Sequence, residues 1–107
     1  MDEWKNVSIN GVSSIDKVVA EFNVWSMQKL PFPKFKVKIR EEQSGAFFGS
    51  TNLAVKSQID GEPDWISGYG NTITAALEDT INSFFSTLHG YSELVEEDFV
   101  WADIHDF

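Results

Sequence analysis

The chain has 107 residues, of which 42% are apolar, none is Cys and 14% are aromatic, and its formal net charge is −9 at pH 7. This length predicts a single domain over residues 1–107, and the apolar content excludes a chain that is disordered throughout. The absence of Cys excludes disulfides and thiolate metal sites, and the negative charge disfavours phosphate backbones and anionic membranes as partners.

No apolar run approaches the roughly 20 residues that a membrane helix needs. The start Met1-Asp-Glu-Trp-Lys5 has neither the basic nor the apolar region of a signal peptide. We therefore expect a cytoplasmic protein with no membrane partner.

The segment before Pro31 predicts a short strand and then a helix. Trp4–Ile9 has the composition of an edge strand, Asn10-Gly11 is a turn signal, and Ser13-Ser14 offers an N-cap. Pro31 ends the helix near Leu30. The apolar residues between follow the i, i+3, i+4, i+7 spacing of an amphipathic helix: Ile15, Val18, Val19, Phe22 and Trp25.

Three strands of an antiparallel meander are predicted next. The first strand alternates strictly, with apolar residues at its odd positions and four bases at its even positions. The expected strands span 34–40, 47–59 and 63–69, with loops at Glu41–Gly45 and Asp60-Gly61.

A second helix and an acidic segment follow the meander. Gly68-Tyr-Gly-Asn71 breaks the third strand, Thr72 is the expected N-cap, and His89-Gly90 is the expected C-cap region. Ser92 is expected to cap a short third helix over 93–98. The stripe predicted to be buried in the second helix is Ile73, Ala76, Leu77, Ile81, Phe84, Phe85 and Leu88.

Both long helices have one apolar face, and the meander has one face to cover. Packing both helices on the same side of the sheet covers all three. We therefore predict an α+β fold, a two-layer sandwich in which a three-stranded antiparallel meander packs against two helices. Its α-β-β-β-α core spans residues 13–88, and an acidic, aromatic C-terminal extension spans residues 91–107.

This order of elements resembles the double-stranded-RNA-binding domain. The resemblance covers residues 13–88 and is carried by Gly68-Tyr-Gly-Asn-Thr-Ile-Thr-Ala-Ala-Leu77, which is similar to the family's glycine turn, capping hydroxyl and following alanine, and by Leu30-Pro-Phe-Pro-Lys-Phe35. The lysines with which that family holds phosphates are replaced here by Ile73, Thr74 and Leu77. Residues 34–88 also resemble HicB-type antitoxins, which place a Gly-x-Thr-capped, Ala-Leu-rich helix after a meander. Neither fold implies a function by itself.

Charge is distributed unevenly along the chain. Lys56 is the last base: residues 1–56 hold all eight bases against six acids, and residues 57–107 hold eleven carboxylates and no Lys or Arg. Such asymmetry bears on partners more directly than on fold.

The C-terminal extension combines carboxylates with large apolar side chains. In one interpretation the carboxylates steer a basic partner and the aromatic side chains act as anchors. In the other, the apolar residues pack on the domain as a terminal strand or helix. The candidate partner-binding residues are Glu93, Glu96, Glu97, Asp98, Phe99, Trp101, Asp103 and Asp106.

The polar face of the first meander strand is a candidate anion-binding stripe, because alternate strand residues lie about 6–7 Å apart on one face. The alternative is an outer sheet face whose charges pair with carboxylates of a neighbouring strand or of the acidic segment. The residues concerned are Lys34, Lys36, Lys38 and Arg40.

No catalytic motif is present. The chain has no Cys and no Gly-x-Ser-x-Gly elbow, and Glu78 with Asp79 lies on the solvated side of a helix. His89 and His105 are the two histidines, and Asp103-x-His105-Asp106 lacks a further spaced ligand. We predict a protein that is not an enzyme and uses neither cofactor nor metal.

These observations favour a non-catalytic acidic binding protein that engages a basic surface of a protein partner. Inhibitors, immunity proteins and nucleic-acid mimics act in this way, and nucleic-acid enzymes and nuclease toxins carry such basic surfaces. One alternative is a nucleic-acid-binding module that uses the stripe from Lys34 to Arg40. Another is a homo-oligomeric structural or assembly protein in which the tail of one chain meets the basic strand of the next.

Overall fold

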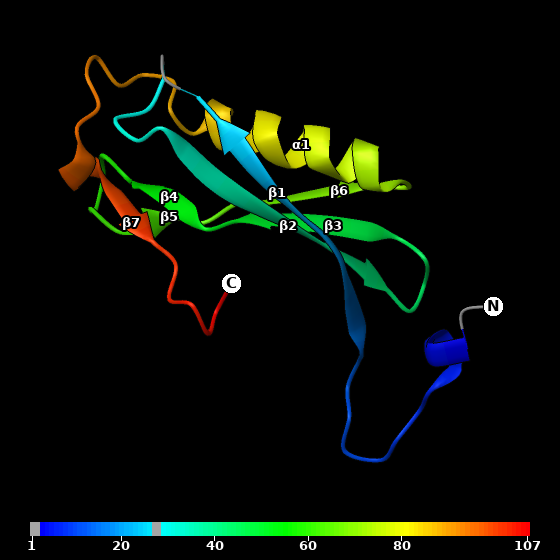
Figure 1. Ribbon diagram of the computed structural model, residues 1–107. Coiled ribbons are helices and arrows are strands. Elements are labelled where there is room, and N and C mark those ends of the chain that lie inside the picture. Colours follow the sequence, from blue (N-terminus) through cyan, green and yellow to red (C-terminus); the bar gives the residue numbers. More distant parts are fainter. Residues whose placement is uncertain (1–2, 27–28) are drawn as a thin grey trace.

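The computed structural model describes residues 3–26 and 29–107, which form one α-helix and two antiparallel sheets (Figure 1). The four-stranded sheet has the order β1 (Asp16–Trp25), β2 (Lys34–Glu42), β3 (Phe47–Thr51), β6 (Ser67–Gly70). The three-stranded sheet has the order β5 (Pro63–Asp64), β4 (Leu53–Lys56), β7 (Phe99–Trp101). The helices are α1 (Ile73–Ser86) and two 3₁₀ turns, η1 (Glu3–Asn6) and η2 (Glu96–Asp98). The predicted α+β class is confirmed.

The predicted first helix is wrong, because its residues form β1. This strand pairs antiparallel with β2, with a bulge between Val18 and Ala20. A bulge adds one residue and shifts the alternation of side chains from that point on. Apolar residues on both sides of such a shift mimic a helical spacing, while the β-branched and aromatic composition of the segment favours a strand. Residues 27 and 28, near the predicted helix end, lie outside the described residues.

The predicted N-terminal strand over Trp4–Ile9 is also wrong. Its first residues form η1, which is held against the β2–β3 hairpin. Gln43 Nε2 donates to the carbonyls of Trp4 and Val7 at 3.2 and 2.9 Å, and Lys5 Nζ lies 2.6 Å from Glu41 Oε2. The segment 7–15 then extends away from the sheets before β1 begins (Figure 1).

The second and third predicted strands each divide between the two sheets. The chain leaves the large sheet at Asn52, between β3 and β4. Asn52 Oδ1 accepts from Lys36 N at 2.8 Å, and its carbonyl accepts from Ala102 N at 2.8 Å. Asn52 therefore joins the large sheet to the segment that follows β7.

Helix α1 lies over β6, β3 and β2. Its N-cap is Thr72 as predicted, with Oγ1 accepting from Ala75 N at 3.0 Å. The approach is close because Gly68 has no side chain: a Cβ there would lie 2.3 Å from Thr80 N. The helix ends with Thr87 as the C-cap, two residues before the predicted His89-Gly90. The buried core is Leu30, Phe35, Val37, Ile39, Leu53, Val55, Ala76, Phe84, Leu88 and Phe99.

The observed order of elements lacks the first helix on which the resemblance to the double-stranded-RNA-binding domain depends. What remains of it is a meander followed by a helix. In the described residues, no helix is long and apolar enough to cross a membrane.

Candidate functional site

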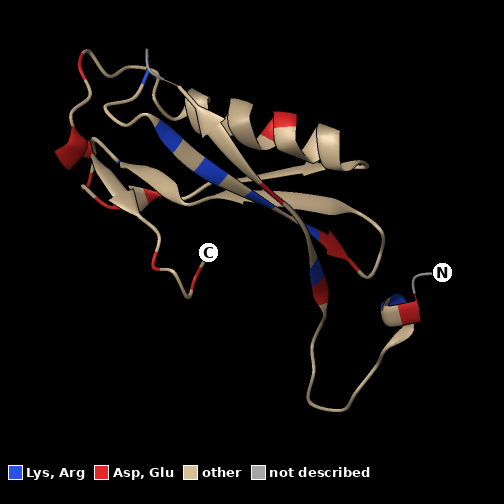
Figure 2. Cartoon of the chain, viewed as in Figure 1, with Lys and Arg blue, Asp and Glu red and all other residues tan. Residues whose placement is uncertain are grey.

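The three-stranded sheet brings two acidic segments together at one end. Both β5 and β7 pair with β4, and Val55 lies opposite Asp64 on one side and Phe99 on the other. The turn before β5 and the segment before β7 therefore reach the same end of β4. In Figure 2, several stretches of the backbone coloured red for Asp and Glu gather at the end of the molecule remote from η1. We call this the acidic pole: Asp60, Glu62, Asp64, Glu93, Glu96, Glu97 and Asp98.

Within residues 3–26 and 29–107, no carboxylate of the acidic pole forms an ion pair with a base. Six of its carboxylates are exposed and Asp98 is half-buried. In the part of the chain that the structure describes, every ion pair between side chains lies on the four-stranded sheet or joins η1 to it. Two of the carboxylates bind backbone amides: Asp60 accepts from Glu62 N at 3.0 Å and Asp98 from Val95 N at 2.9 Å.

Three members of the acidic pole, Asp60, Glu62 and Asp64, are not among the predicted partner-binding residues. The sequence assigns the first two to an ordinary turn. Their proximity to Glu96 follows only from the pairing of β5 and β7 with the same strand. The sequence feature that points to these three residues is the excess of carboxylates after Lys56.

The aromatic residues of the C-terminal segment differ in exposure. Phe99 is 7% exposed and its ring lies 5.5 Å from that of Phe32, so it belongs to the core and is not available as an anchor. Trp101 is 45% exposed and packs edge-on against the same Phe32 at 4.9 Å. Exposed Ile59 and Val95 lie on the two segments of the acidic pole itself. The predicted third helix shortens to the 3₁₀ turn η2, and β7 follows it directly.

The basic strand face is largely paired with β1. Lys36 Nζ and Lys38 Nζ lie 3.7 and 3.8 Å from the carboxylate of Glu21. Arg40 Nε lies 3.8 Å from Asp16 Oδ1. Pairing with carboxylates of a neighbouring strand is the alternative that the sequence offers for this face, but the sequence does not identify the strand, because it predicts a helix over the residues of β1. Of the four bases Lys34 differs: its ammonium lies over the Trp25 ring, 5.2 Å from the centroid, with no carboxylate within ion-pair distance among the described residues.

The end of the acidic segment does meet the basic strand, but not through its carboxylates. Lys38 Nζ donates to the Phe107 carbonyl at 2.6 Å and lies 4.3 Å from the centre of its ring. Asp103 and Asp106 form no ion pair in the described part of the chain. Residues 102–107 therefore lie across the sheet face that α1 leaves open.

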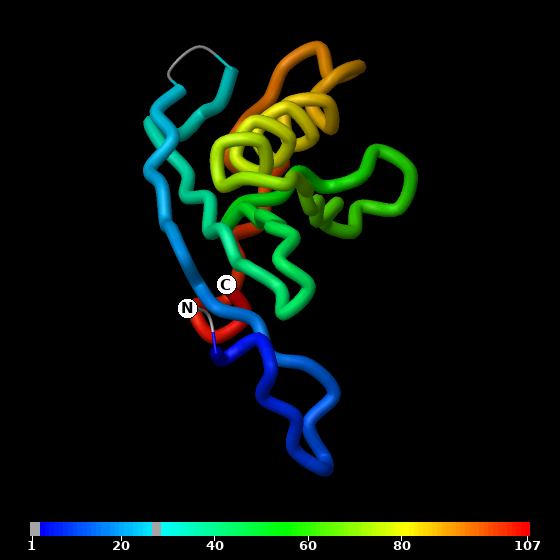
Figure 3. Tube along the Cα trace, turned by 90° about the vertical axis from the view of Figure 1, so that its right-hand side faces the viewer, coloured from blue at the N-terminus to red at the C-terminus, as the bar shows by residue number. Residues whose placement is uncertain are grey.

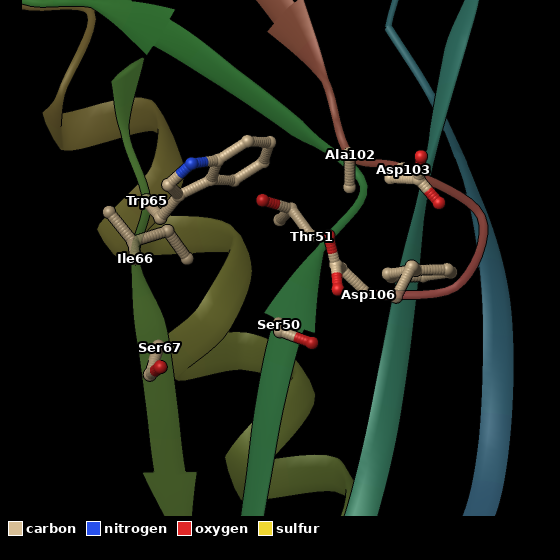
Figure 4. A pocket seen from close by; sticks show the side chains of 9 residues that line it. Ser50, Thr51, Trp65, Ile66, Ser67, Ala102, Asp103 and Asp106 are labelled. Atoms are coloured by element: carbon tan, nitrogen blue, oxygen red, sulfur yellow. The ribbon is translucent and has the colours of Figure 1, made fainter. Parts of the chain in front are cut away.

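A cavity of about 300 Å³ lies between this segment and strands β3 and β6 (Figure 4). The Asp106 carboxylate points from the segment toward β3 and Trp65, a residue that is 46% exposed. The Asp103 carboxylate turns away and accepts from His105 N at 2.8 Å. A carboxylate beside an exposed indole suits a cationic group. The cavity is lined by Ser50, Thr51, Trp65, Ile66, Ser67, Ala102, Asp103, Asp106 and Phe107.

The described residues do not bring together three His, Asp or Glu side chains able to hold a metal ion. The two histidines, His89 and His105, are both exposed and lie in separate segments. Comparison with protein-family models, curated proteins and solved structures gives no match for this chain.

Proposed function

We propose that this chain is a non-catalytic binding protein whose acidic pole docks on a basic surface of a protein partner. The observation that carries the proposal is the gathering of seven carboxylates at one end, none of which forms an ion pair with a base among the described residues. Inhibitors, immunity-type proteins and nucleic-acid mimics are the classes that fit, and a nucleic-acid enzyme or nuclease toxin is the kind of partner.

Carboxylates in such an arrangement act at a distance. Their summed field attracts a basic surface and speeds its association, by one to three orders of magnitude in strongly steered pairs. They also repel nucleic acid and anionic membranes. The field therefore selects a class of partner before any contact forms.

Close contact requires apolar groups as well as charge. The exposed Val95 and Ile59 lie on the segments of the acidic pole, and the half-exposed Trp101 lies at the other end of β7, opposite Leu53. Aromatic side chains at the centre of an interface commonly supply most of its affinity. We assign the role of anchor to Trp101 and not to Phe99, which is buried. The cavity at Trp65 and Asp106 would take one lysine or arginine side chain of the partner.

The test is affinity capture of the partner by wild-type protein at low salt, repeated with two charge reversals. Glu96→Lys changes the acidic pole, and Glu78→Lys makes the same change of net charge on the exposed face of α1. We expect wild type and Glu78→Lys to capture the same protein, Glu96→Lys to lose it, and added salt to elute it. Equal loss in both variants, or retention in high salt, would overturn the proposal.

A further inference from the structure

Strand β1 is the outermost strand of the four-stranded sheet and pairs on one side, with β2. It has ten residues, against the five or six that are usual, and contains no proline. In Figure 3 it runs in blue along one side of the molecule. Long edge strands offer unpaired backbone groups to another chain, and proteins generally shorten or interrupt them.

The backbone groups that face outward can be identified from neighbouring hydrogen bonds. Ser26 N donates to the Pro33 carbonyl at 3.0 Å, so the backbone of Ser26 faces β2. Alternate residues of a strand face the same way. Glu21, Asn23 and Trp25 therefore turn their N–H and C=O groups away from β2, and no hydrogen bond among the described residues takes up these groups.

The same edge carries an apolar row. Ala20, Phe22 and Val24 lie on the α1 side of the sheet, each opposite a buried residue of β2. They remain half-buried because α1 lies over β6, β3 and β2 rather than over β1. A strand added to this edge would bury the row and pair the backbone groups together.

We propose that a second copy of this chain occupies the edge, with the two β1 strands antiparallel about a twofold axis at Asn23. Glu21 then lies opposite Trp25 of the second copy, and Asn23 opposite its own counterpart. The outward N–H and C=O groups of Glu21, Asn23 and Trp25, six in each copy, then meet C=O and N–H groups of the second copy. On the other face, Phe22 lies opposite Val24 of the second copy.

Registers with the twofold axis at Phe22 or Glu21 pair the two strands less favourably. Side chains on one face must stay on that face, so the axis moves only in whole residues. An axis at Phe22 sets Trp25 against the bulged Val19, and an axis at Glu21 sets two carboxylates directly opposite each other. The axis at Asn23 leaves the bulge outside the paired segment.

Charge also favours a second copy at this edge. In the proposed register, Glu21 of the second copy comes alongside Trp25, over whose ring lies the Lys34 ammonium. Lys34 is the base of the strand face that has no carboxylate within ion-pair distance among the described residues. Because the paired strands run antiparallel, the two acidic poles lie toward opposite ends of the joined sheet.

The first test is sedimentation velocity from micromolar to millimolar concentration at moderate salt. Asn23→Pro removes an outward N–H without removing a bond to β2, a position at which an edge strand tolerates proline. Asn23→Thr is the matched control, because it changes the same side chain and keeps the N–H. We expect wild type and Asn23→Thr to dimerise and the dissociation constant of Asn23→Pro to rise about tenfold or more. A monomeric wild type at every concentration, or unchanged dimerisation of a folded Asn23→Pro, would overturn the proposal.

Hydrogen exchange of the wild-type protein provides a readout that needs no variant. The amides of Phe22 and Val24 bond to β2 and are protected at all concentrations. Those of Glu21, Asn23 and Trp25 are expected to gain protection as concentration rises. Protection of the outward amides that does not change with concentration would contradict the proposed dimer.

Discussion

On the four-stranded sheet Lys36, Lys38 and Arg40 lie within ion-pair distance of carboxylates of β1. The seven carboxylates around the three-stranded sheet have no base within that distance among the described residues. The first arrangement makes cross-strand pairs that favour one register. In the second arrangement the carboxylates repel one another, and this repulsion lowers the stability of the fold. From this comparison we propose that charge has a structural role in one region and an intermolecular role in the other.

The largest loss of stability is expected from a substitution between helix α1 and the four-stranded sheet. Gly68→Ala places a methyl group where Cβ would lie 2.3 Å from Thr80 N, so helix and sheet must separate. We expect a loss of about 3 kcal/mol in the free energy of unfolding, measured by thermal or urea denaturation. Gly11→Ala is the control: its φ of +92° costs about 1 kcal/mol, but nothing lies within 4 Å of its Cβ. Equal losses in the two variants would rule out close packing as the cause.

A smaller loss of stability is expected from a substitution at the junction between the two sheets. Asn52→Ala leaves Lys36 N without its acceptor at the point where the chain passes from one sheet to the other. We expect a loss of about 1.5 kcal/mol. Hydrogen exchange should show faster exchange in β4 and β7 than in β2 and β3. Uniform acceleration throughout the chain would indicate that the sheets do not open separately.

The sequence predicts β2 and α1 better than it predicts the segment before β2. The Thr72 cap and the apolar stripe of α1 are local signals, and β2 alternates without interruption. The segment 16–25 misleads because one bulge changes the phase of a strand, and a bulge depends on the partner strand. The division at Asn52 also escapes, since nothing local shows that one extended run serves two sheets.

The candidate site shows the same limit. The excess of carboxylates after Lys56 is visible in the sequence, and it points to the C-terminal segment as a binding site. That Asp60, Glu62 and Asp64 join that segment depends on β5 and β7 sharing β4. That Phe99 is buried and Trp101 half-exposed depends on the packing of Phe32. Long-range pairing decided which residues gather, and single-sequence patterns do not contain it.

A substitution that removes one negative charge from the four-stranded sheet is expected to have a modest effect. Glu21→Gln removes the shared partner of Lys36 and Lys38. Because these groups are partly exposed, we expect a loss of only about 0.5 kcal/mol, seen in urea denaturation at low ionic strength and reduced at high salt. No change at low salt would show that these contacts do not contribute to stability.

The most direct test of the contrast between the two regions compares Glu21→Gln with Glu96→Gln in that same experiment. Each substitution removes one negative charge. We expect Glu96→Gln to raise the free energy of unfolding by about 0.3 kcal/mol at low ionic strength, because it relieves repulsion within the acidic pole. Opposite signs that converge at high salt are the predicted result. A loss of stability in Glu96→Gln would contradict the account, since it would mean that the acidic pole is held by favourable interactions within the chain.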